Sequence, residues 1–243
     1  MATAKSRNRS RRAFIGKLGA VSTALAATAG AVVAATPGRE TPIAGDPSLR
    51  AALLEEEKAL RRLHQTFEQA MDKGLHEDVI AMFADDAQVV FAGGVFEQRE
   101  HGVTRLYRER FPAGKTGRRM EQAPGFELAA EEQQDSVDVA PDRMSATAVF
   151  PYSIQVGMPF ETESSLAAMA RLHGEGVRTW WEGGVYRIAY RKDAAGAWKI
   201  SRLEYDTLSR ADWRTGKRYA QPISVAFLST RFPADPQGPD DLA

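Results

Sequence analysis

Cysteine is missing altogether from the 243 residues of this chain. Its absence excludes disulfide bonds, zinc sites built on thiolates and a cysteine nucleophile. The stability of the folded protein must therefore come from packing alone.

Acidic residues are missing from the first part of the chain, where none precedes Glu40 and six basic residues lie within the first 17. Residues 18–35 are uncharged, weakly apolar and end in three small residues, as a cleavable signal does. The adjacent Arg11 and Arg12 resemble a twin-arginine (Tat) signal. We therefore expect a signal peptide at residues 1–35 and a periplasmic or secreted protein. An uncleaved membrane anchor is the alternative.

Removal of this signal leaves 26 basic and 32 acidic residues, a net charge of −6. A net negative chain disfavours a nucleic-acid partner, which would require a basic face. The remaining length suits one domain with a proper core. We expect a linker over 36–47, a domain over 48–212 and a C-terminal extension over 213–243.

Helices dominate the first half of this domain. Apolar residues at three- and four-residue steps predict a long helix from Ser48 to Lys73, which Gly74 ends. The other elements expected here are a helix over 76–83, a strand over 87–92 and a helix over 100–111.

Short β-type runs dominate the second half and are separated by turn residues. Helices followed by a meander of strands predict an α+β fold, in which helices cover one face of a mostly antiparallel sheet. The strands are expected at 136–140, 144–156, 177–191 and 197–209, with a helical insertion over 163–173 and a loose tail from Phe232.

Two stretches carry a family resemblance: "FEQAMDKGLHEDVIAMFADDAQVVF" at 67–91 and "EGGVYRIAYRKDAAGAWKI" at 182–200. They resemble the opening and the late hairpin of the SnoaL-like, or nuclear-transport-factor-like, family. The resemblance covers residues 50–210 and implies a cone-shaped fold, with a curved sheet packed by a long N-terminal helix and two shorter helices. This fold hosts isomerases, dehydratases and binding modules, so it does not by itself name a function.

Enzymes of this family place an acid/base pair in a cavity between the sheet and the first helix. Where ketosteroid isomerases carry the oxyanion-donating tyrosine and the general base, this chain has Phe67 and Phe91. A phenylalanine holds neither a proton nor a charge, so the resemblance implies that the isomerase mechanism is lost. Gln133 or Gln134 stands where dehydratases carry a base histidine, whereas Asp72 matches their aspartate.

Asp72 and His64 are the candidate base and relay of an acid/base site. Asp72 stands at the end of the first helix, and the alternative is a carboxylate that satisfies the turn. His64 lies at the edge of the apolar stripe and suits proton transfer near neutral pH, or is simply a hydrogen-bonded histidine. The spacing of the four histidines does not predict a metal site.

The last strand offers Glu204 and Asp206 as acids on the opposite wall. Alternation by twos places both carboxylates on the packed face, together with the tryptophan that begins the strand. A β-bulge near Arg202 would instead turn Leu203 and Tyr205 inward. The sequence leaves both arrangements open.

Aromatic residues are expected to wall an apolar ligand pocket, with plain core packing as the alternative. Gly183 and Gly184 predict a bulge or the close approach of a ligand. The candidate ligand-binding residues are Phe67, Phe91, Trp180, Trp181, Tyr186 and Tyr205.

Two functions remain open at this point. The first is a lyase (dehydratase) or isomerase that acts on a small hydrophobic molecule by acid/base catalysis without a cofactor. The second is a non-catalytic module that binds a hydrophobic ligand or a partner chain, including a homodimer through the sheet face. The lost isomerase groups favour the second, and Asp72 with the charged last strand favours the first.

Overall fold

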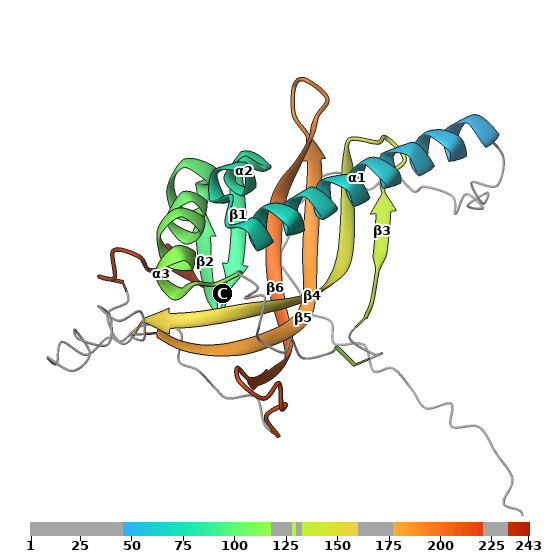
Figure 1. Cartoon of the computed structure of the whole chain (residues 1–243). Coiled ribbons are helices and arrows are strands. Elements are labelled where there is room, and N and C mark those ends of the chain that lie inside the picture. Colours follow the sequence, from blue (N-terminus) through green and yellow to red (C-terminus); the bar gives the residue numbers. More distant parts are fainter. Residues whose placement is uncertain (1–45, 118–127, 130–132, 160–176, 221–232) are drawn as a thin grey trace, which may run out of the picture. The chain divides into compact units, whose positions relative to one another are not determined.

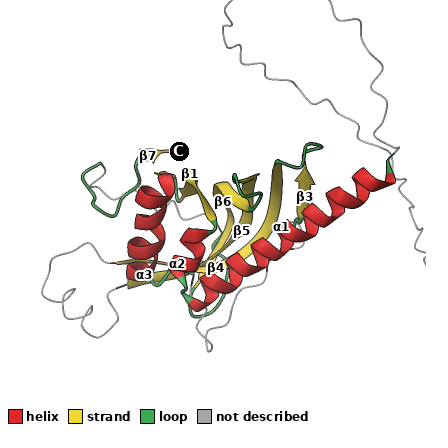
Figure 2. Ribbon diagram, turned by 90° about the horizontal axis from the view of Figure 1, so that it is seen from above, coloured by secondary structure: helices red, strands yellow, loops and turns green. Residues whose placement is uncertain are grey.

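The computed structural model describes residues 46–117, 128–129, 133–159, 177–220 and 233–243. They form a curved seven-stranded sheet with helices along one face (Figures 1 and 2). The α+β fold expected from the order of helices and strands is therefore confirmed. The expected signal peptide, most of the linker and the helical insertion lie outside the described residues.

Helix α1 (Pro47–Lys73) has a defined start and a defined end. The Asp46 carboxylate accepts a hydrogen bond from the Ser48 amide at 2.9 Å, and Pro47 occupies the first turn, where its missing amide costs nothing. Gly74 ends the helix with φ 67°, a conformation that glycine adopts freely. The helix predicted from Ser48 to Lys73 is confirmed.

One face of α1 packs against the sheet. Its buried residues recur at three- and four-residue steps, as the apolar stripe of a surface helix requires. They are Leu60, His64, Phe67, Ala70 and Met71.

The chain then turns into α2 (His76–Ala81) and β1 (Phe83–Phe91). Backbone hydrogen bonds close the turn after α1, one of them from the Leu75 amide to the Ala70 carbonyl at 2.8 Å. The strand begins four residues before the predicted start because buried Phe83 already pairs with Ile200 of strand β6 (Trp198–Asp212). Tertiary pairing has overridden the local helix pattern here.

A tight turn through Ala92 and Gly93, both with positive φ, leads into β2 (Gly94–Glu97). The short strand that follows it was not predicted.

Residues 98–114 are helical, but their turns are wider than those of the expected α-helix. In place of one helix over 100–111 the chain forms two π-helical segments, η1 (Gln98–Val103) and η2 (Arg105–Arg110), and then α3 (Phe111–Gly114). The Thr104 hydroxyl donates to the Arg99 carbonyl five residues earlier at 2.6 Å, which suits a π turn.

The second half is the predicted meander. Strands β3 (Ser136–Val139), β4 (Ser145–Pro159) and β5 (Val177–Lys192) pair antiparallel in sequence, and β5 pairs in the same way with β6. Their bounds lie within three residues of the predicted ones. Strands β4 and β5 bend strongly along their length (Figure 1).

A parallel pairing of β1 with β6 joins the early and the late strands into one sheet. The other pairings are antiparallel, so the sheet is mostly antiparallel, as expected. The strand order is β3-β4-β5-β6-β1-β2-β7, where β7 is Asp241–Leu242.

Strand β6 contains two bulges that decide which side chains face α1. Ser201 is the extra residue of the first, because Tyr190 pairs with Ile200 and Ala189 with Arg202. Leu208 is the extra residue of the second, opposite Gly183 and Gly184. A bulge shifts the alternation by one residue, so Leu203 and Tyr205 face the core. Of the two arrangements left open for this strand, the bulge is confirmed.

Residues 233–243 are docked on the sheet, which corrects the expectation of a loose tail. Strand β7 pairs with β2, and the Asp240 carboxylate accepts bonds from the Glu97 amide at 2.8 Å and from Arg105 at 2.5 Å. These bonds cover the free edge of β2. Composition alone does not reveal such anchors, because they consist of single polar residues.

Candidate functional site

The aromatic residues expected to wall a pocket form the core between α1 and the sheet. Phe67 lies 5.7 Å from Tyr186, and Phe91 and Tyr186 each lie 5.1 Å from Tyr205, measured between ring centroids. All four side chains are buried, and Trp180 is buried with them. These described rings fill the space against one another, as the core-packing alternative predicts.

Trp181 lies on the opposite face of the sheet. Its ring stacks on Trp213 with centroids 4.5 Å apart, and its Nε1 donates to the Trp213 carbonyl at 3.1 Å. Successive residues of a strand face opposite sides, so Trp180 and Trp181 cannot wall the same pocket.

A cleft of about 240 Å³ opens between the C-terminal half of α1 and strands β4 and β5. Asp72 lines it, and Tyr186 belongs both to this lining and to the aromatic core. The helix contributes a polar wall and the strands a more apolar one. The lining residues are Gln65, Glu68, Gln69, Met71, Asp72, Tyr152, Ser153, Ile154 and Tyr186.

Three titratable residues follow one another at four-residue steps along α1 and so share one face of the helix. They are His64, Glu68 and Asp72. Glu68 and Asp72 line the cleft, whereas His64 lies beneath it with Nε2 3.7 Å from Glu68 Oε1. The carboxylate nearest to His64 on this face is therefore Glu68, which the sequence analysis did not single out.

His64 is held in an apolar environment. Its side chain stacks on the Phe150 ring with centroids 3.8 Å apart, and only 6% of the residue is exposed. Burial lowers the pKa of His64 to about 4, against a smaller opposite effect from the charge of Asp135. Its Nδ1 has no hydrogen-bond partner among the described residues. At neutral pH the imidazole is therefore uncharged.

Glu182 of β5 is a buried carboxylate behind the cleft. Arg210 Nε donates to its Oε2 at 2.9 Å and the Thr207 hydroxyl to its Oε1 at 2.7 Å. The Tyr152 hydroxyl and the Trp180 indole nitrogen lie at 3.3 and 3.4 Å. A carboxylate that accepts from four donors has the partners that a buried charge requires.

A second polar pair lies within the aromatic core, where the Tyr107 and Tyr205 hydroxyls are 3.0 Å apart. Burial raises the pKa of both tyrosines well above the usual value. These hydroxyls consequently stay protonated at neutral pH and share one hydrogen bond, which either of them can donate.

Glu204 and Asp206 lie on the open face of the sheet, which corrects their expected place opposite Asp72. Asp206 accepts two hydrogen bonds from Arg187, at 2.9 and 2.7 Å, and Glu204 lies 3.9 Å from Arg202. The bulge at residue 201 is the cause, because it shifts the alternation before these residues are reached. The structure does not bring them together with Asp72 or His64.

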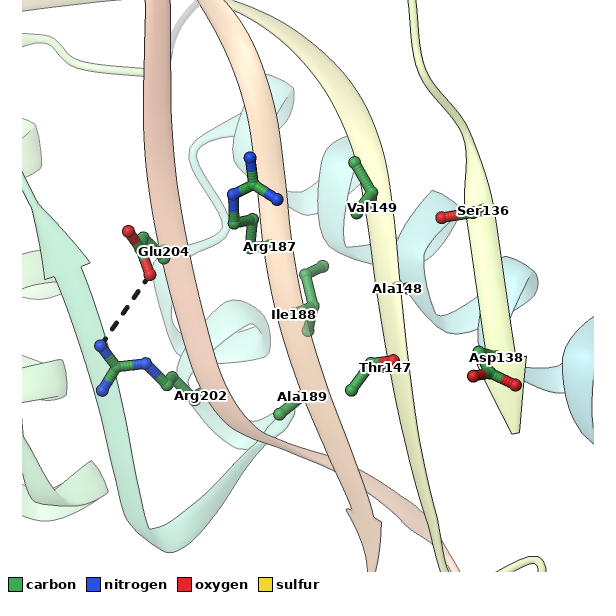
Figure 3. Close-up of a pocket in the computed structure, with 10 residues that line it drawn as sticks. All are labelled: Ser136, Asp138, Thr147, Ala148, Val149, Arg187, Ile188, Ala189, Arg202 and Glu204. Atoms are coloured by element: carbon green, nitrogen blue, oxygen red, sulfur yellow. Dashed lines mark ion pairs between the residues drawn. The ribbon is translucent and has the colours of Figure 1, made fainter. Parts of the chain in front are cut away.

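The open face carries a groove of about 340 Å³. Arg202 and Glu204 lie along one side of it and Asp138 along the other, with Arg187 and mostly uncharged side chains between them (Figure 3). This is the face on which a second copy was expected, and the homodimer stays a prediction.

Metal ligands do not cluster in the part of the chain that the structure describes, where no three His, Asp or Glu side chains gather around one point. In the same residues no helix is both long and apolar enough to cross a membrane.

The residues that sequence reasoning missed left weak signals. Glu182 precedes two glycines and resembles a turn residue, although it lies inside a 16-residue strand. Tyr152 alternates with buried Phe150 and Ile154 along β4, which marks its face but not its hydrogen bonds. Glu68 was detectable, since it is one helical turn from both His64 and Asp72.

Solved structures with similar folds share little sequence with this chain. An NTF2-like protein with a cystatin-like fold from Novosphingobium aromaticivorans has 18% identity and a TM-score of 0.42, over 65% of this chain and 84% of that one. The hexachlorocyclohexane dehydrochlorinase LinA-type3 from Novosphingobium barchaimii LL02 has 15% identity and a TM-score of 0.45, over 73% and 100%. A LinA Type2 dehydrochlorinase has 15% identity and a TM-score of 0.47, over 73% and 99%.

Sequence comparison identifies the family of this chain but no individual relative. Among curated proteins the search finds no match. The profile of the SnoaL-like domain, in contrast, matches residues 52–204, which include most of α1, the cleft and the strands that form its wall. The chain therefore belongs to the SnoaL-like domain family.

Proposed function

We propose that this protein binds a small molecule in the cleft beside Asp72. The observation that carries the proposal is the cleft itself, in which titratable side chains of α1 face tyrosines of the sheet. Concave sites with few polar groups and an apolar wall are where small ligands bind.

The lining favours a ligand with an apolar body and a polar group. Met71 and Ile154 supply apolar contact, with the tyrosine rings beside them. Glu68 and Asp72 supply carboxylate oxygens, which only accept hydrogen bonds when ionised. A purely hydrophobic ligand would leave those oxygens desolvated.

A lyase or isomerase is the second candidate function. It is favoured by the row of His64, Glu68 and Asp72, which sets two carboxylates in the cleft and a neutral imidazole beneath. Asp72 would remove a proton from the ligand and return it to a second position, or to the leaving hydroxyl, so that one carboxyl group closes the proton balance. His64, the expected relay, is a neutral neighbour of Glu68 in this scheme, because its Nδ1 has no partner among the described residues that could pass a proton on. Glu204 and Asp206 have no part in this scheme, because they lie on the other face.

Ligand screening with a blocked variant tests the binding function. A library of small ketones, alcohols and phenols is screened by NMR on the full chain. Gln69→Trp fills the cleft from an exposed position of α1 and should abolish the binding of any hit. Asp78→Asn, on the exposed side of α2, is the control and should bind as before. Hits that bind equally well to Gln69→Trp would place the site elsewhere.

Turnover separates the enzyme from the binding module. Removing a positioned base costs roughly two to four decades in rate, so Asp72→Asn should bind the hit but lose turnover. A folded Asp72→Asn variant with full turnover would remove Asp72 from the mechanism. Binding without turnover in the unaltered protein would leave the non-catalytic function.

We also propose that the protein is exported through the Tat route and matures near Thr36. The twin arginine and the charge-free run that follows it support this. Replacing Arg11 and Arg12 with lysine should keep the protein in the cytoplasmic fraction. Unchanged export would eliminate the Tat route.

A further inference from the structure

Glu182 is costly to keep inside this protein. Its side chain is 4% exposed, and that of its partner Arg210 is 15% exposed. Desolvation of such a pair offsets its attraction, and apolar residues of similar size often stabilise a fold equally well. Net stability is therefore a weak reason for a carboxylate at this position, and its contacts offer a better one.

Those contacts fix where the protons lie. The oxygen of Thr207 is 2.7 Å from Glu182 Oε1, a distance that needs a proton between them. Glu182 accepts from four donors, so the proton belongs to Thr207. Thr207 has no second proton for Tyr152, whose hydroxyl is 3.1 Å away. The Tyr152 hydroxyl must therefore donate, toward Thr207 and Glu182.

The tyrosine that is held in this way belongs to the wall of the cleft. Tyr152 stacks on Tyr186 with centroids 4.6 Å apart and planes 27° from parallel, and both line the cleft. The Tyr205 ring forms T-shaped contacts with both rings, with centroid distances of 5.6 Å to Tyr152 and 5.1 Å to Tyr186. A rotation of Tyr152 would consequently move Tyr186.

We propose that Glu182 is a positioning residue of the cleft, whose carboxylate holds Tyr152 by its hydroxyl and, through the stack, sets the place of Tyr186. The Thr207 hydroxyl also contacts Tyr152, and Arg210 pairs with the other oxygen of the carboxylate at 2.9 Å. The significance for a ligand rests on the function proposed above, but the coupling from Glu182 to Tyr186 does not.

Two replacements in the full chain test this coupling. Glu182→Gln keeps the size of the side chain but turns one acceptor into a donor. The new NH2 group faces either Arg210 and Trp180, which are donors themselves, or Thr207 and Tyr152, whose donated hydrogen bonds it cannot accept. Thr207→Val removes one acceptor of the Tyr152 proton without changing the charge. Glu204→Gln is the control, since it makes the same chemical change on the open face of a neighbouring strand.

Tyrosine NMR gives a readout that general loss of stability would not produce. With the Cζ carbons labelled and Tyr152→Phe used for assignment, the exchange of the Tyr152 hydroxyl proton should accelerate about tenfold or more in Glu182→Gln, and less in Thr207→Val. The Tyr186 resonance should shift in both, while the remaining tyrosines outside the cluster keep theirs. Glu204→Gln should change neither exchange nor shift.

Ligand binding then separates the two proposals. A hit from the NMR screen should bind about tenfold more weakly to Glu182→Gln than to Glu204→Gln. Slow exchange and an unmoved Tyr186 in both Glu182→Gln and Thr207→Val would overturn the positioning role, whatever the screen finds. If the screen finds no ligand but Tyr186 moves, the positioning role stands and the proposed function fails. If Glu182→Gln does not fold, Thr207→Val alone decides.

Discussion

Strands β5 and β6 carry an arginine–carboxylate pair on each face of the sheet. On the face that α1 covers, Arg210 meets Glu182 with side chains 15% and 4% exposed. On the open face, Arg187 meets Asp206 with side chains 57% and 33% exposed. The nitrogen–oxygen distances, 2.9 and 2.7 Å, are nearly the same.

Equal chemistry in different surroundings has different consequences. In an exposed pair each charged group replaces hydrogen bonds to water by a contact of similar strength, so the pair contributes little to the stability of the fold. A buried pair has lost its water, so each member depends on the other and on the remaining donors. The inner pair is thus the one through which a single replacement reaches the cleft.

The largest effect is expected from breaking the inner pair. Arg210→Ala leaves Glu182 buried beside only neutral donors and should lower the free energy of unfolding by about 3–5 kcal/mol. Urea denaturation of the variant and of Arg187→Ala measures the contrast, and the outer replacement should cost about 1 kcal/mol or less. Equal costs would show that burial does not distinguish the pairs.

A double replacement sharpens the same comparison. Glu182→Leu combined with Arg210→Met removes both charges and should recover most of the stability lost in Arg210→Ala. The stack of Tyr152 would nevertheless lose its anchor. Stability and the position of Tyr186 are therefore expected to separate in this variant.

His64 should make the stability of the folded protein sensitive to acid. The folded protein keeps His64 neutral down to a pKa of about 4, while the unfolded chain takes up the proton near pH 6.5. Between these values the unfolded state binds more protons, so stability should fall as the pH is lowered from 6.5 to 4, by about 3 kcal/mol. Chemical denaturation across this range measures the slope.

A matched pair of variants isolates the contribution of His64. His64→Phe keeps a ring on Phe150 and should flatten the slope by that amount, whereas replacement of exposed His101 by glutamine should not. An unchanged slope in His64→Phe would mean that carboxylates account for the acid sensitivity. It would also mean that folding does not lower the pKa of the His64 imidazole.

Gly184 lies opposite the second bulge of β6, the one that turns the Arg210 side chain toward the covered face. A Cβ at this position would collide with the carbonyl oxygen of Asp206, which is backbone and cannot rotate away. Gly184→Ala should lower the free energy of unfolding by roughly 1–3 kcal/mol. Thermal denaturation measures this cost, and no loss would mean that the strands separate easily at the bulge.

The sequence predicted the strands better than it predicted their faces. Hydrophobic runs and turn residues gave the ends of β4, β5 and β6 within three residues, because those signals are local. The face of each side chain depends instead on every residue between it and the start of the strand. One extra residue at Ser201 moved Glu204 and Asp206 from the covered face to the open one.

The candidate site was predictable in part for the same reason. Asp72 and His64 lie on a continuous helix, where a fixed period relates them to each other and to Glu68. The donors of Glu182 come from three strands and meet only because the second bulge turns Arg210 inward. Gly183 and Gly184 predicted that bulge, but no local signal names the side chain that it redirects.

The smallest effect is expected on the open face. Glu204→Gln and Asp206→Asn remove one charge each from side chains that are 39% and 33% exposed, and water can take the place of the lost partner. Each should change the free energy of unfolding by about 0.5 kcal/mol or less, and neither should alter turnover or ligand affinity at the cleft. Urea denaturation and the ligand titrations used for Glu182→Gln measure both. A loss of turnover in Asp206→Asn with the fold intact would return this carboxylate to the mechanism, and the distinction between the faces would then no longer hold.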